Sequence, residues 1–432
     1  MKTLKQRIQT KKAKIAVIGL GYVGLPLAVS FARVGFKVSG LDKSQARVLR
    51  IAKGKNYNED VSLLEIATLL KRKVFEVSTN LALMANADVI IICVPTPLKT
   101  KYTPDISYIV GAVKEIRKHV RKGMLIVLES TTFPGTTEEL IKPLLEESGL
   151  KAAEDFFLVF SPERIDPGNK HFSVTKIPKI VGGCTPQAGE LGKALYSQII
   201  KKVHLVSSPR AAEMTKLLEN SFRLINISWV NELAMMCHKL HIDIWEIIEA
   251  AKTKPFGFMP FYPSLGVGGH CIPDDPLYLY WKAKHHGISS KFIKLSADTN
   301  DRVPEYVLSR LRHLLRHQGQ CQARARVLLV GVTYKKDVKD LRRSSVLKFM
   351  ELLKKEGYDV QYFDPLVPFL KMGPLDMKSV KLNRQEICKA DCVVVAVAHS
   401  QVNYGLILAH AQSIFDLCNV YQGQKKATID RL

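Results

Sequence analysis

The stretch KIAVIGLGYVGLPLAVSFARV, residues 14–34, decides the fold of the first part of the chain. Its first five residues form a short apolar run typical of a buried strand, and its last ten form an apolar stretch typical of a helix. Between them stands G-x-G-x-x-G, in which Gly19 permits a tight turn, Gly21 lets the backbone approach a pyrophosphate, and Gly24 lets helix and strand pack together. The N-terminus of the helix faces the phosphate charge. The stretch therefore predicts a dinucleotide-binding unit.

The residues that follow indicate which dinucleotide is bound. A second strand at 37–41 ends in Asp42, whose carboxylate can accept hydrogen bonds from both ribose hydroxyls and would repel a 2′-phosphate, so NAD is favoured over NADP. A further strand at 88–94 stops at Pro95 and Thr96, where a doubly wound sheet places its ligand crevice. The alternatives are an ordinary tight turn and an ordinary proline-ended strand. The expected coenzyme contacts are Gly19, Gly21, Tyr22, Val23, Gly24, Asp42, Pro95 and Thr96.

Composition sets broad limits on the class of protein. A chain of 432 residues favours two or three domains. The net charge of +24 favours anionic partners, but we see no zinc-finger spacing and no nucleic-acid module, so we expect no nucleic-acid partner. The eight cysteines stand singly, which favours a reducing compartment. Because no apolar run reaches the roughly 20 residues that span a bilayer, we expect no integral membrane segment and a cytoplasmic location. No metal site is expected.

Two segments in the middle of the chain carry candidate chemistry. Residues 210–240 are helix-forming and contain neither Gly nor Pro, and Lys216 and Asn220 lie four apart on one face of this predicted helix. Taken alone, such a pair is more often solvated surface than catalytic.

The second segment, residues 266–276, reads GVGGHCIPDDP. Its glycines allow the backbone to approach a ligand, and we expect a proline-bounded turn after Cys271 that sets carboxylates nearby. A thiolate is a strong nucleophile toward an aldehyde, and a carboxylate can activate water for hydrolysis. The alternatives are a structural cysteine in a glycine-rich turn, and a cysteine protease pair with His270.

The last part of the chain predicts a second α/β unit. Strands are predicted at 326–331, 359–363, 392–397 and 413–415, with a helix at 345–355. Tyr334, Lys335 and Arg342 fall in the loop after the first of these strands. Without other information they are as well explained by solvated surface.

The chain resembles the UDP-glucose/UDP-N-acetylhexosamine 6-dehydrogenase family over nearly its whole length. The resemblance lies in IAVIGLGYVGLPLA, CVPTP, ESTTFPGTT, SPERIDPG, TKLLENSFRLINI, TKPFGFMPFYP, GVGGHCIP and YKKDVKDLR, which occur in family order. Within the family, PFGF, FYP and GGHCIP are most similar to the UDP-N-acetylglucosamine 6-dehydrogenase branch.

This resemblance implies an NAD-dependent four-electron oxidation of the 6-hydroxyl of a UDP-sugar, through a cysteine thiohemiacetal and thioester. The catalytic residues that it implies are Cys271 as nucleophile, Lys216 and Asn220 as stabilisers of oxyanions, Asp275 as the carboxylate that helps hydrolysis, Thr131 beside the catalytic water and the coenzyme, and Glu163 beside the sugar. The substrate contacts that it implies are Glu163, Arg164, Lys216, Asn220, Phe256, Gly257, Phe258, Tyr262, Gly268, Tyr334, Lys335 and Arg342.

The expected fold class is α/β, with two Rossmann-like doubly wound domains joined by a central helical domain that contains a long helix. The expected domains are an NAD-binding Rossmann domain over residues 1–205, a central helical domain for dimerisation and catalysis over 206–300, and a UDP-sugar-binding α/β domain over 301–432. The expected partners are the UDP-sugar substrate and a second copy of the chain in a homodimer.

The sequence departs from the family pattern at four places. Residues 264–266 read SLG where GPG is usual, and Asp274 adds a second acid beside Asp275. Arg343 begins RSS where ESP is common, and Cys418 replaces the arginine of DTRN. These changes bear on nucleotide affinity and substrate choice more than on catalysis. The alternatives left open are UDP-glucose or UDP-N-acetylmannosamine as substrate, and a catalytically quiet nucleotide-sugar-binding protein.

Overall fold

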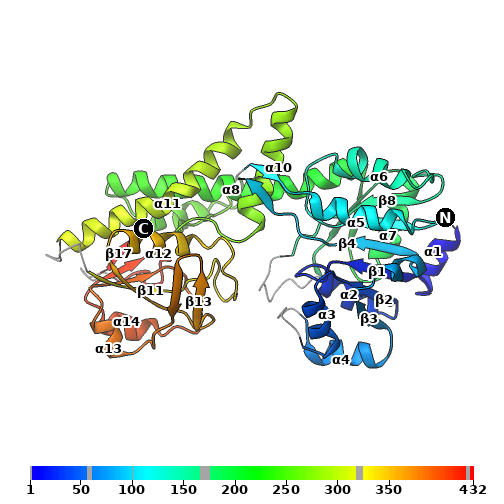
Figure 1. The fold of residues 1–432 in the computed structure, drawn as a ribbon. Helices are drawn as coiled ribbons and strands as arrows, with labels where there is room; N and C mark the ends of the chain where they lie inside the picture. The colour runs from blue at the N-terminus through cyan, green and yellow to red at the C-terminus, as the bar shows by residue number, and fades with distance from the viewer. Residues whose placement is uncertain (1, 56–60, 101, 166–175, 318–324, 425–428) are drawn as a thin grey trace. The chain divides into compact units, whose positions relative to one another are not determined.

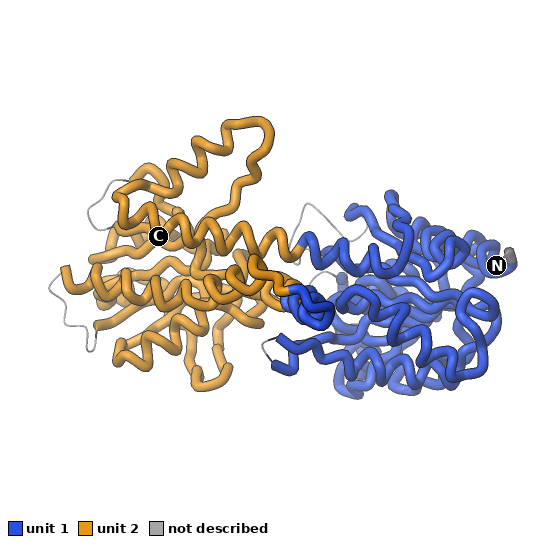
Figure 2. Tube along the Cα trace, turned by 90° about the horizontal axis from the view of Figure 1, so that it is seen from above, with its two compact units in different colours: residues 1–219, 277–288 blue, residues 220–276, 289–432 orange. Residues whose placement is uncertain are grey.

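The computed structural model describes residues 2–55, 61–100, 102–165, 176–317, 325–424 and 429–432 (Figure 1). The chain forms two compact units, residues 1–219 with 277–288 and residues 220–276 with 289–432 (Figure 2). It passes from the first unit to the second inside helix α8 (Pro209–Lys239), returns inside helix α10 (Cys271–His285), and enters the second unit again after residue 288. The three-part division of the sequence remains a prediction.

The first unit is built on an eight-stranded sheet. Its spatial order is β10-β9-β8-β7-β4-β1-β2-β3, and all neighbouring pairs are parallel except β8 with β9. The strands are β1 (Lys14–Ile18), β2 (Lys37–Leu41), β3 (Phe75–Ser78), β4 (Val89–Ile92), β7 (Leu125–Leu128), β8 (Phe157–Phe160), β9 (Lys179–Gly183) and β10 (Val203–Val206), with a separate hairpin of β5 (Leu98–Thr100) and β6 (Thr103–Pro104). The predicted strand at 37–41 is confirmed, and that at 88–94 is shorter than predicted.

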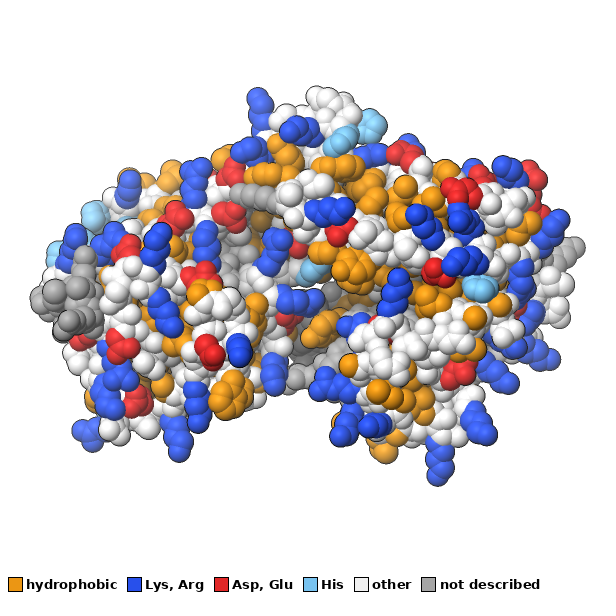
Figure 3. Space-filling view, viewed as in Figure 1, with side chains coloured by type: hydrophobic (Ala, Val, Ile, Leu, Met, Phe, Trp, Pro, Cys, Tyr) orange, Lys and Arg blue, Asp and Glu red, His pale blue; other side chains and the backbone are white. Residues whose placement is uncertain are grey.

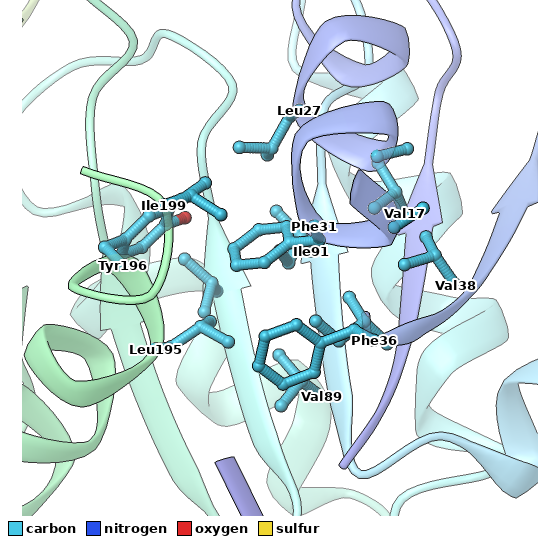
Figure 4. Close-up of a cluster of buried hydrophobic side chains, with 14 of the residues drawn as sticks. Val17, Leu27, Phe31, Phe36, Val38, Val89, Ile91, Leu195, Tyr196 and Ile199 are labelled. Atoms are coloured by element: carbon cyan, nitrogen blue, oxygen red, sulfur yellow. The ribbon is translucent and has the colours of Figure 1, made fainter. Parts of the chain in front are cut away.

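Helices cover both faces of this sheet. They are needed there because apolar side chains alternate between the two faces along each strand and are buried on both. On one face, Phe31 and Tyr196 pack over Val17 and Ile91 (Figure 4). On the other face, Ile90 and Ile92 belong to a second buried cluster. The helices are α1 (Lys2–Gln9), α2 (Gly24–Arg33), α3 (Gln45–Ala52), α4 (Leu63–Lys71), α5 (Ser107–Arg117), α6 (Lys142–Glu146), α7 (Pro186–Tyr196), a 3₁₀ turn at Leu81–Asn86 and a π-helical segment at Thr136–Ile141. A parallel sheet buried on both faces is a doubly wound fold.

The second unit contains a five-stranded parallel sheet in the order β12-β11-β15-β16-β17. Its strands are β11 (Arg326–Val330), β12 (Asp359–Phe363), β15 (Cys392–Val395), β16 (Ile414–Asp416) and β17 (Ile429–Arg431), with a hairpin of β13 (Phe369–Met372) and β14 (Leu375–Lys378). Its helices besides those shared are α9 (Ile244–Lys252), α11 (Lys291–His317), α12 (Ser345–Lys355), α13 (Arg384–Cys388) and α14 (Tyr404–His410). The predicted helix at 345–355 is confirmed, and the predicted strand boundaries hold to within two residues.

Alternation along β11 again explains why this sheet has helices on both faces. Val327 and Leu329 face a buried cluster that includes α12 residues, whereas Leu328 and Val330 face a cluster that includes Ile387 and Ile407. The predicted fold class is therefore confirmed, with two Rossmann-like sheets, a helical region between them in the sequence, and the long helix α8.

Candidate active site

The glycines after β1 have different roles. A Cβ at Gly19, whose φ is +91°, would lie 2.5 Å from the carbonyl oxygen of Cys93, and a Cβ at Gly24 would lie 1.9 Å from that of Gly19. A Cβ at Gly21 would meet no atom of the described residues within 4 Å. Packing within the chain thus requires glycine at positions 19 and 24, whereas at position 21 glycine leaves room for a ligand. This arrangement fits the pyrophosphate of a dinucleotide at the N-terminus of α2.

Asp42 lies at the end of β2 and organises this loop. Its carboxylate accepts hydrogen bonds from the backbone N–H of Leu20 (2.8 Å) and of Ser44 (2.9 Å), and it pairs with the guanidinium of Arg47 (2.7 Å). Asp42 is buried. The carboxylate therefore shapes the glycine loop in addition to the ribose contact predicted for it.

The loops after β4 and β7 meet at the same edge of the sheet. Thr96 is buried, and its carbonyl accepts a hydrogen bond from the hydroxyl of Tyr278, while the hydroxyl of Ser130 donates to the carbonyl of Val94 (2.8 Å). Pro95 and Tyr22 are exposed, and Val23 precedes α2. These loops occupy the carboxyl edge, where doubly wound sheets bind their ligands.

Lys216 and Thr131 are brought together by α8. The ammonium of Lys216 donates a hydrogen bond to the hydroxyl of Thr131, which follows β7. The N-terminal part of α8 is held by Glu213, whose carboxylate accepts hydrogen bonds from the backbone N–H of Gly135 (2.6 Å) and of Thr137 (2.9 Å). Burial raises the pKa of Glu213 to about 7. Sequence reasoning missed Glu213, which has no local motif.

Glu163 belongs to a buried charged cluster of Glu129, Glu163 and Lys179. The Lys179 ammonium lies 2.8 Å from a Glu163 oxygen and 3.2 Å from a Glu129 oxygen, and the same Glu129 oxygen accepts from the hydroxyl of Tyr196. Burial raises the pKa of Glu129. At Glu163 burial acts in the same direction, but the charge and hydrogen bond of Lys179 outweigh it and lower the pKa. Lys179 and Glu129 were missed because they are distant in sequence from Glu163.

Arg164, the next residue, is also engaged within the first unit. Its guanidinium pairs with Glu219 at 2.6 Å and donates to the carbonyl of Pro178. The end of the SPERIDPG stretch, residues 166–168, lies outside the described residues.

In the second unit, Cys271 is the first residue of α10. The predicted proline-bounded turn is wrong, because the helix begins at Cys271 and carries Asp274 and Asp275 in its first turns. Pro273 is tolerated there because the first N–H groups of a helix have no intrahelical partner. Cys271 is half-buried, and both carboxylates are almost fully buried.

The two carboxylates have different partners. Asp275 accepts a hydrogen bond from the side-chain amide of Asn220 (2.6 Å), so the structure brings these predicted residues together. Asp274 lies 2.7 Å from the guanidinium of Arg343. Burial raises the pKa of Asp274 to about 6, against the opposing charge of Arg343 and with a smaller contribution from Asp275.

The glycine segment before Cys271 is held by the loop after β11 and by α11. A Cβ at Gly268 would lie 2.8 Å from the Cβ of Tyr334, and the N–H of Gly269 donates to the carbonyl of Arg342 (3.0 Å). The side chain of Asn300 accepts from the N–H of Val267 (2.6 Å) and donates to its carbonyl (3.3 Å). Sequence reasoning missed Asn300.

The predicted sugar-enclosing loop is more open. Phe256 and Phe258 are exposed, and Gly257 has a φ of +70°. Tyr262 stacks on Trp245 and donates to Glu249 (2.7 Å). The structure thus places Tyr262 against α9.

Among the predicted nucleotide contacts, the guanidinium of Arg342 pairs with Asp340 (2.7 Å), and the carbonyl of Lys335 accepts from the hydroxyl of Thr333 (2.9 Å). Burial raises the pKa of the Cys418 thiol to about 12, so this side chain supplies no charge at neutral pH.

Three observations concern charge, metals and membranes. Lys and Arg side chains are spread over the visible face without gathering in one patch (Figure 3). Within the described ranges, no cluster of three or more His, Cys, Asp or Glu residues could hold a metal ion. No helix of the described chain is long and apolar enough to cross a membrane.

Three family models match the chain in sequence order. They are the NAD binding domain (residues 13–200), the central domain (210–302) and the UDP binding domain (328–423) of the UDP-glucose/GDP-mannose dehydrogenase family.

Known proteins agree with these matches. The chain is 38% identical to the UDP-N-acetyl-D-glucosamine 6-dehydrogenase of Pseudomonas aeruginosa, over 90% of this chain and 92% of that protein. It is 34% identical to a UDP-N-acetyl-D-mannosamine dehydrogenase of Pyrococcus horikoshii, over 90% of both chains. A solved UDP-D-ManNAc dehydrogenase from Pyrococcus horikoshii superposes with a TM-score of 0.87 at 30% identity, covering 97% of this chain and 98% of that one. The chain therefore belongs to the UDP-glucose/GDP-mannose dehydrogenase family, as an NAD-dependent UDP-sugar dehydrogenase.

Proposed function

We propose that the substrate is UDP-N-acetylglucosamine and that its 6-hydroxyl is oxidised to a carboxylate. The PFGF, FYP and GGHCIP segments support this choice. So do two relatives, from Pseudomonas aeruginosa and Salmonella typhi, that are UDP-N-acetyl-D-glucosamine 6-dehydrogenases at 38% and 35% identity. Relatives at 34% identity that are UDP-N-acetyl-D-mannosamine dehydrogenases make that sugar the main rival.

The observation that carries the mechanism is the start of α10, where Cys271 is followed by the buried Asp275 that Asn220 holds. NAD would accept a hydride from C6 in each of two oxidations. After the first, the Cys271 sulfur adds to the aldehyde carbon and forms a thiohemiacetal, which can lose a second hydride to give a thioester. Water then adds to the thioester carbonyl, with Asp275 taking its proton, and the carbon–sulfur bond breaks to release the acid and the Cys271 thiolate.

Lys216 would stabilise the oxygen that carries negative charge in these steps. A cation held in a partly buried site is worth more there than in water, because the local dielectric is lower. Its contact with Thr131 supports a fixed position for the ammonium.

Counting NADH tests this mechanism. We expect two NADH per UDP-N-acetylglucosamine, and a Cys271→Ala variant that folds and binds nucleotide but makes acid at least about 10³-fold more slowly. Cys388→Ala, which changes an exposed cysteine, is the matched control. One NADH per sugar, or near-normal acid formation by the variant, would contradict covalent catalysis. A kcat/KM at least about tenfold higher for UDP-glucose or UDP-N-acetylmannosamine would reassign the substrate, since tenfold corresponds to about 1.4 kcal/mol of transition-state binding.

We also infer that the chain forms a homodimer through α8. Phe222, Trp229 and Met236 recur every seven residues and are 44%, 55% and 52% exposed. Apolar side chains in such a stripe on one helix favour packing against another helix. Trp229→Glu should shift sedimentation from dimer to monomer, whereas Leu64→Glu, at an exposed leucine of α4, should leave it unchanged. An unchanged dimer in the first variant would remove α8 from the interface.

A further inference from the structure

One ion pair links the start of α10 to the loop after β11. Asp274, the acid beside Asp275, pairs with Arg343 at 2.7 Å. The Asp274 carboxylate is 3% exposed and the Arg343 side chain is 49% exposed. A glutamate at 343 would place a second carboxylate against a buried one, which is unfavourable. The cation of Arg343 instead offsets the buried charge of Asp274.

The pair joins two segments that differ in their expected roles. Arg343 ends the loop that contains Tyr334 and Arg342, in the domain that matches the UDP binding model. Asp274 lies three residues after Cys271. The N–H of Gly269 also bonds to the carbonyl of Arg342 at 3.0 Å. The loop and the cysteine segment are thus joined on both sides of Cys271.

The backbone at Arg343 is strained. Its φ of +47° is a left-handed conformation that residues other than glycine, asparagine and aspartate rarely adopt. Such conformations persist where surrounding contacts enforce them, and they concentrate at functional sites. At Arg343 this backbone conformation occurs together with the ion pair to Asp274.

We propose that Arg343 is a positioning residue, whose ion pair with Asp274 couples occupancy of the UDP-binding loop to the reactivity of Cys271. This inference rests on the proposed function for the roles of the loop and of the cysteine. A bound diphosphate would contact the loop that carries Arg343 and restrict its motion. Because Arg343 pairs with Asp274, the first turn of α10 would then be restricted as well. Coupling between two sites through one shared contact is reciprocal.

The test measures alkylation of Cys271 by iodoacetamide, followed by peptide mapping, with and without saturating UDP. In the wild type we expect UDP to slow alkylation about fivefold or more, the lower end of usual coupling. Arg343→Lys, which keeps the cation, should retain most of this ratio. Arg343→Asn, which suits the left-handed backbone but removes the cation, should bring the ratio to within about twofold of one, close to no coupling. Lys355→Asn removes an exposed cation elsewhere and is the control.

A double variant separates coupling from general damage. Asp274→Asn should reduce the ratio as Arg343→Asn does, and the double variant should reduce it no further. Additive losses, a normal ratio in Arg343→Asn, or a wild-type cysteine indifferent to UDP would each overturn the proposal. Calorimetry with UDP and melting curves accompany each variant, and Asp274→Asn keeps the test decisive if Arg343→Asn unfolds. Production of NADH from UDP-sugars is measured separately, so wild-type turnover without coupling would refute this inference and leave the proposed function standing.

Discussion

Replacing Lys179 by methionine should destabilise the first unit in a pH-dependent way. The ammonium lies between the Glu129 and Glu163 carboxylates and is 4% exposed. Methionine fills similar space but leaves two buried carboxylates without a cation. Removing one partner from a buried ion pair costs about 3–5 kcal/mol. For a unit of this size each kcal/mol lowers the melting temperature by about 2–4 °C, so we expect a fall of roughly 6–20 °C near neutral pH.

The direction of the pH effect follows from the two carboxyl groups. In the wild type the pKa of Glu163 is lowered, so its charged form contributes stability above its ordinary range of ionisation. In the variant the charge of Lys179 no longer offsets burial, so the folded-state pKa of the carboxyl groups rises. A raised folded-state pKa gives stability that is present at low pH and lost as the pH rises. The difference in unfolding free energy between the wild type and Lys179→Met should therefore be larger at pH 8 than at pH 5.

Urea unfolding and thermal melts at both pH values check this expectation. Lys193→Met, which removes an exposed cation from α7, is the matched control and should change stability little. A deficit below about 1 kcal/mol, or one that is the same at pH 5 and pH 8, would show that the cluster is not held by the charge of Lys179.

Two further predictions concern residues that the sequence singled out or missed. Cys418→Arg should lower KM for the UDP-sugar by supplying a charge-assisted phosphate contact. The decrease should be about tenfold if that contact is worth 1.5 kcal/mol or more. An unchanged KM in steady-state kinetics would mean that another basic residue already contacts the phosphate. Glu213→Gln should lower the free energy of unfolding by about 1–3 kcal/mol at pH 5, because one backbone N–H then faces an amide N–H donor in place of an acceptor. It should also flatten the decline in unfolding free energy as pH rises toward the Glu213 pKa of about 7; an equally steep decline would assign that slope to another group.

Local patterns explain why much of the fold could be predicted from the sequence. The strand at 37–41 and the helix at 345–355 have the predicted bounds, because their apolar periodicity is contained within each segment. The long helix was predicted at 210–240 and observed at Pro209–Lys239. The start of α10 was wrong, because three glycines before Cys271 and two prolines after it suggested a turn. A proline such as Pro273 costs little at a helix start, and the helix also contains Pro276.

Residues whose meaning depends on distant partners could not be predicted. Lys179 matters because of Glu129, fifty positions earlier, and Arg343 because of Asp274. Asn300, on α11, similarly holds Val267 in the loop before α10. No spacing rule links these residues, since only the fold makes them neighbours. Family resemblance supplied Lys216, Asp275, Thr131 and Asn220 as candidates. The structure adds the contacts between them, Lys216 with Thr131 and Asp275 with Asn220.

Asp42 leads to a last prediction about coenzyme choice. An ionised carboxylate has about four acceptor positions, and here Leu20, Ser44 and Arg47 already use three. The carboxylate can therefore accept hydrogen bonds from both ribose hydroxyls only if the Arg47 guanidinium shares its acceptor position with one of them or moves away.

The Arg47 side chain is 39% exposed, so its cation is available to a 2′-phosphate beside Asp42. Arginine is the group that accommodates this phosphate in NADP enzymes. Arg47→Met should therefore lower kcat/KM for NADP more than for NAD, raising the selectivity for NAD by about tenfold, the value of one charge-assisted contact of about 1.5 kcal/mol. Arg50→Met, at an exposed arginine of the same helix, should leave the ratio unchanged. If selectivity for NAD falls or stays constant in Arg47→Met, the guanidinium serves only to hold Asp42, and the repulsion of NADP comes from the carboxylate alone.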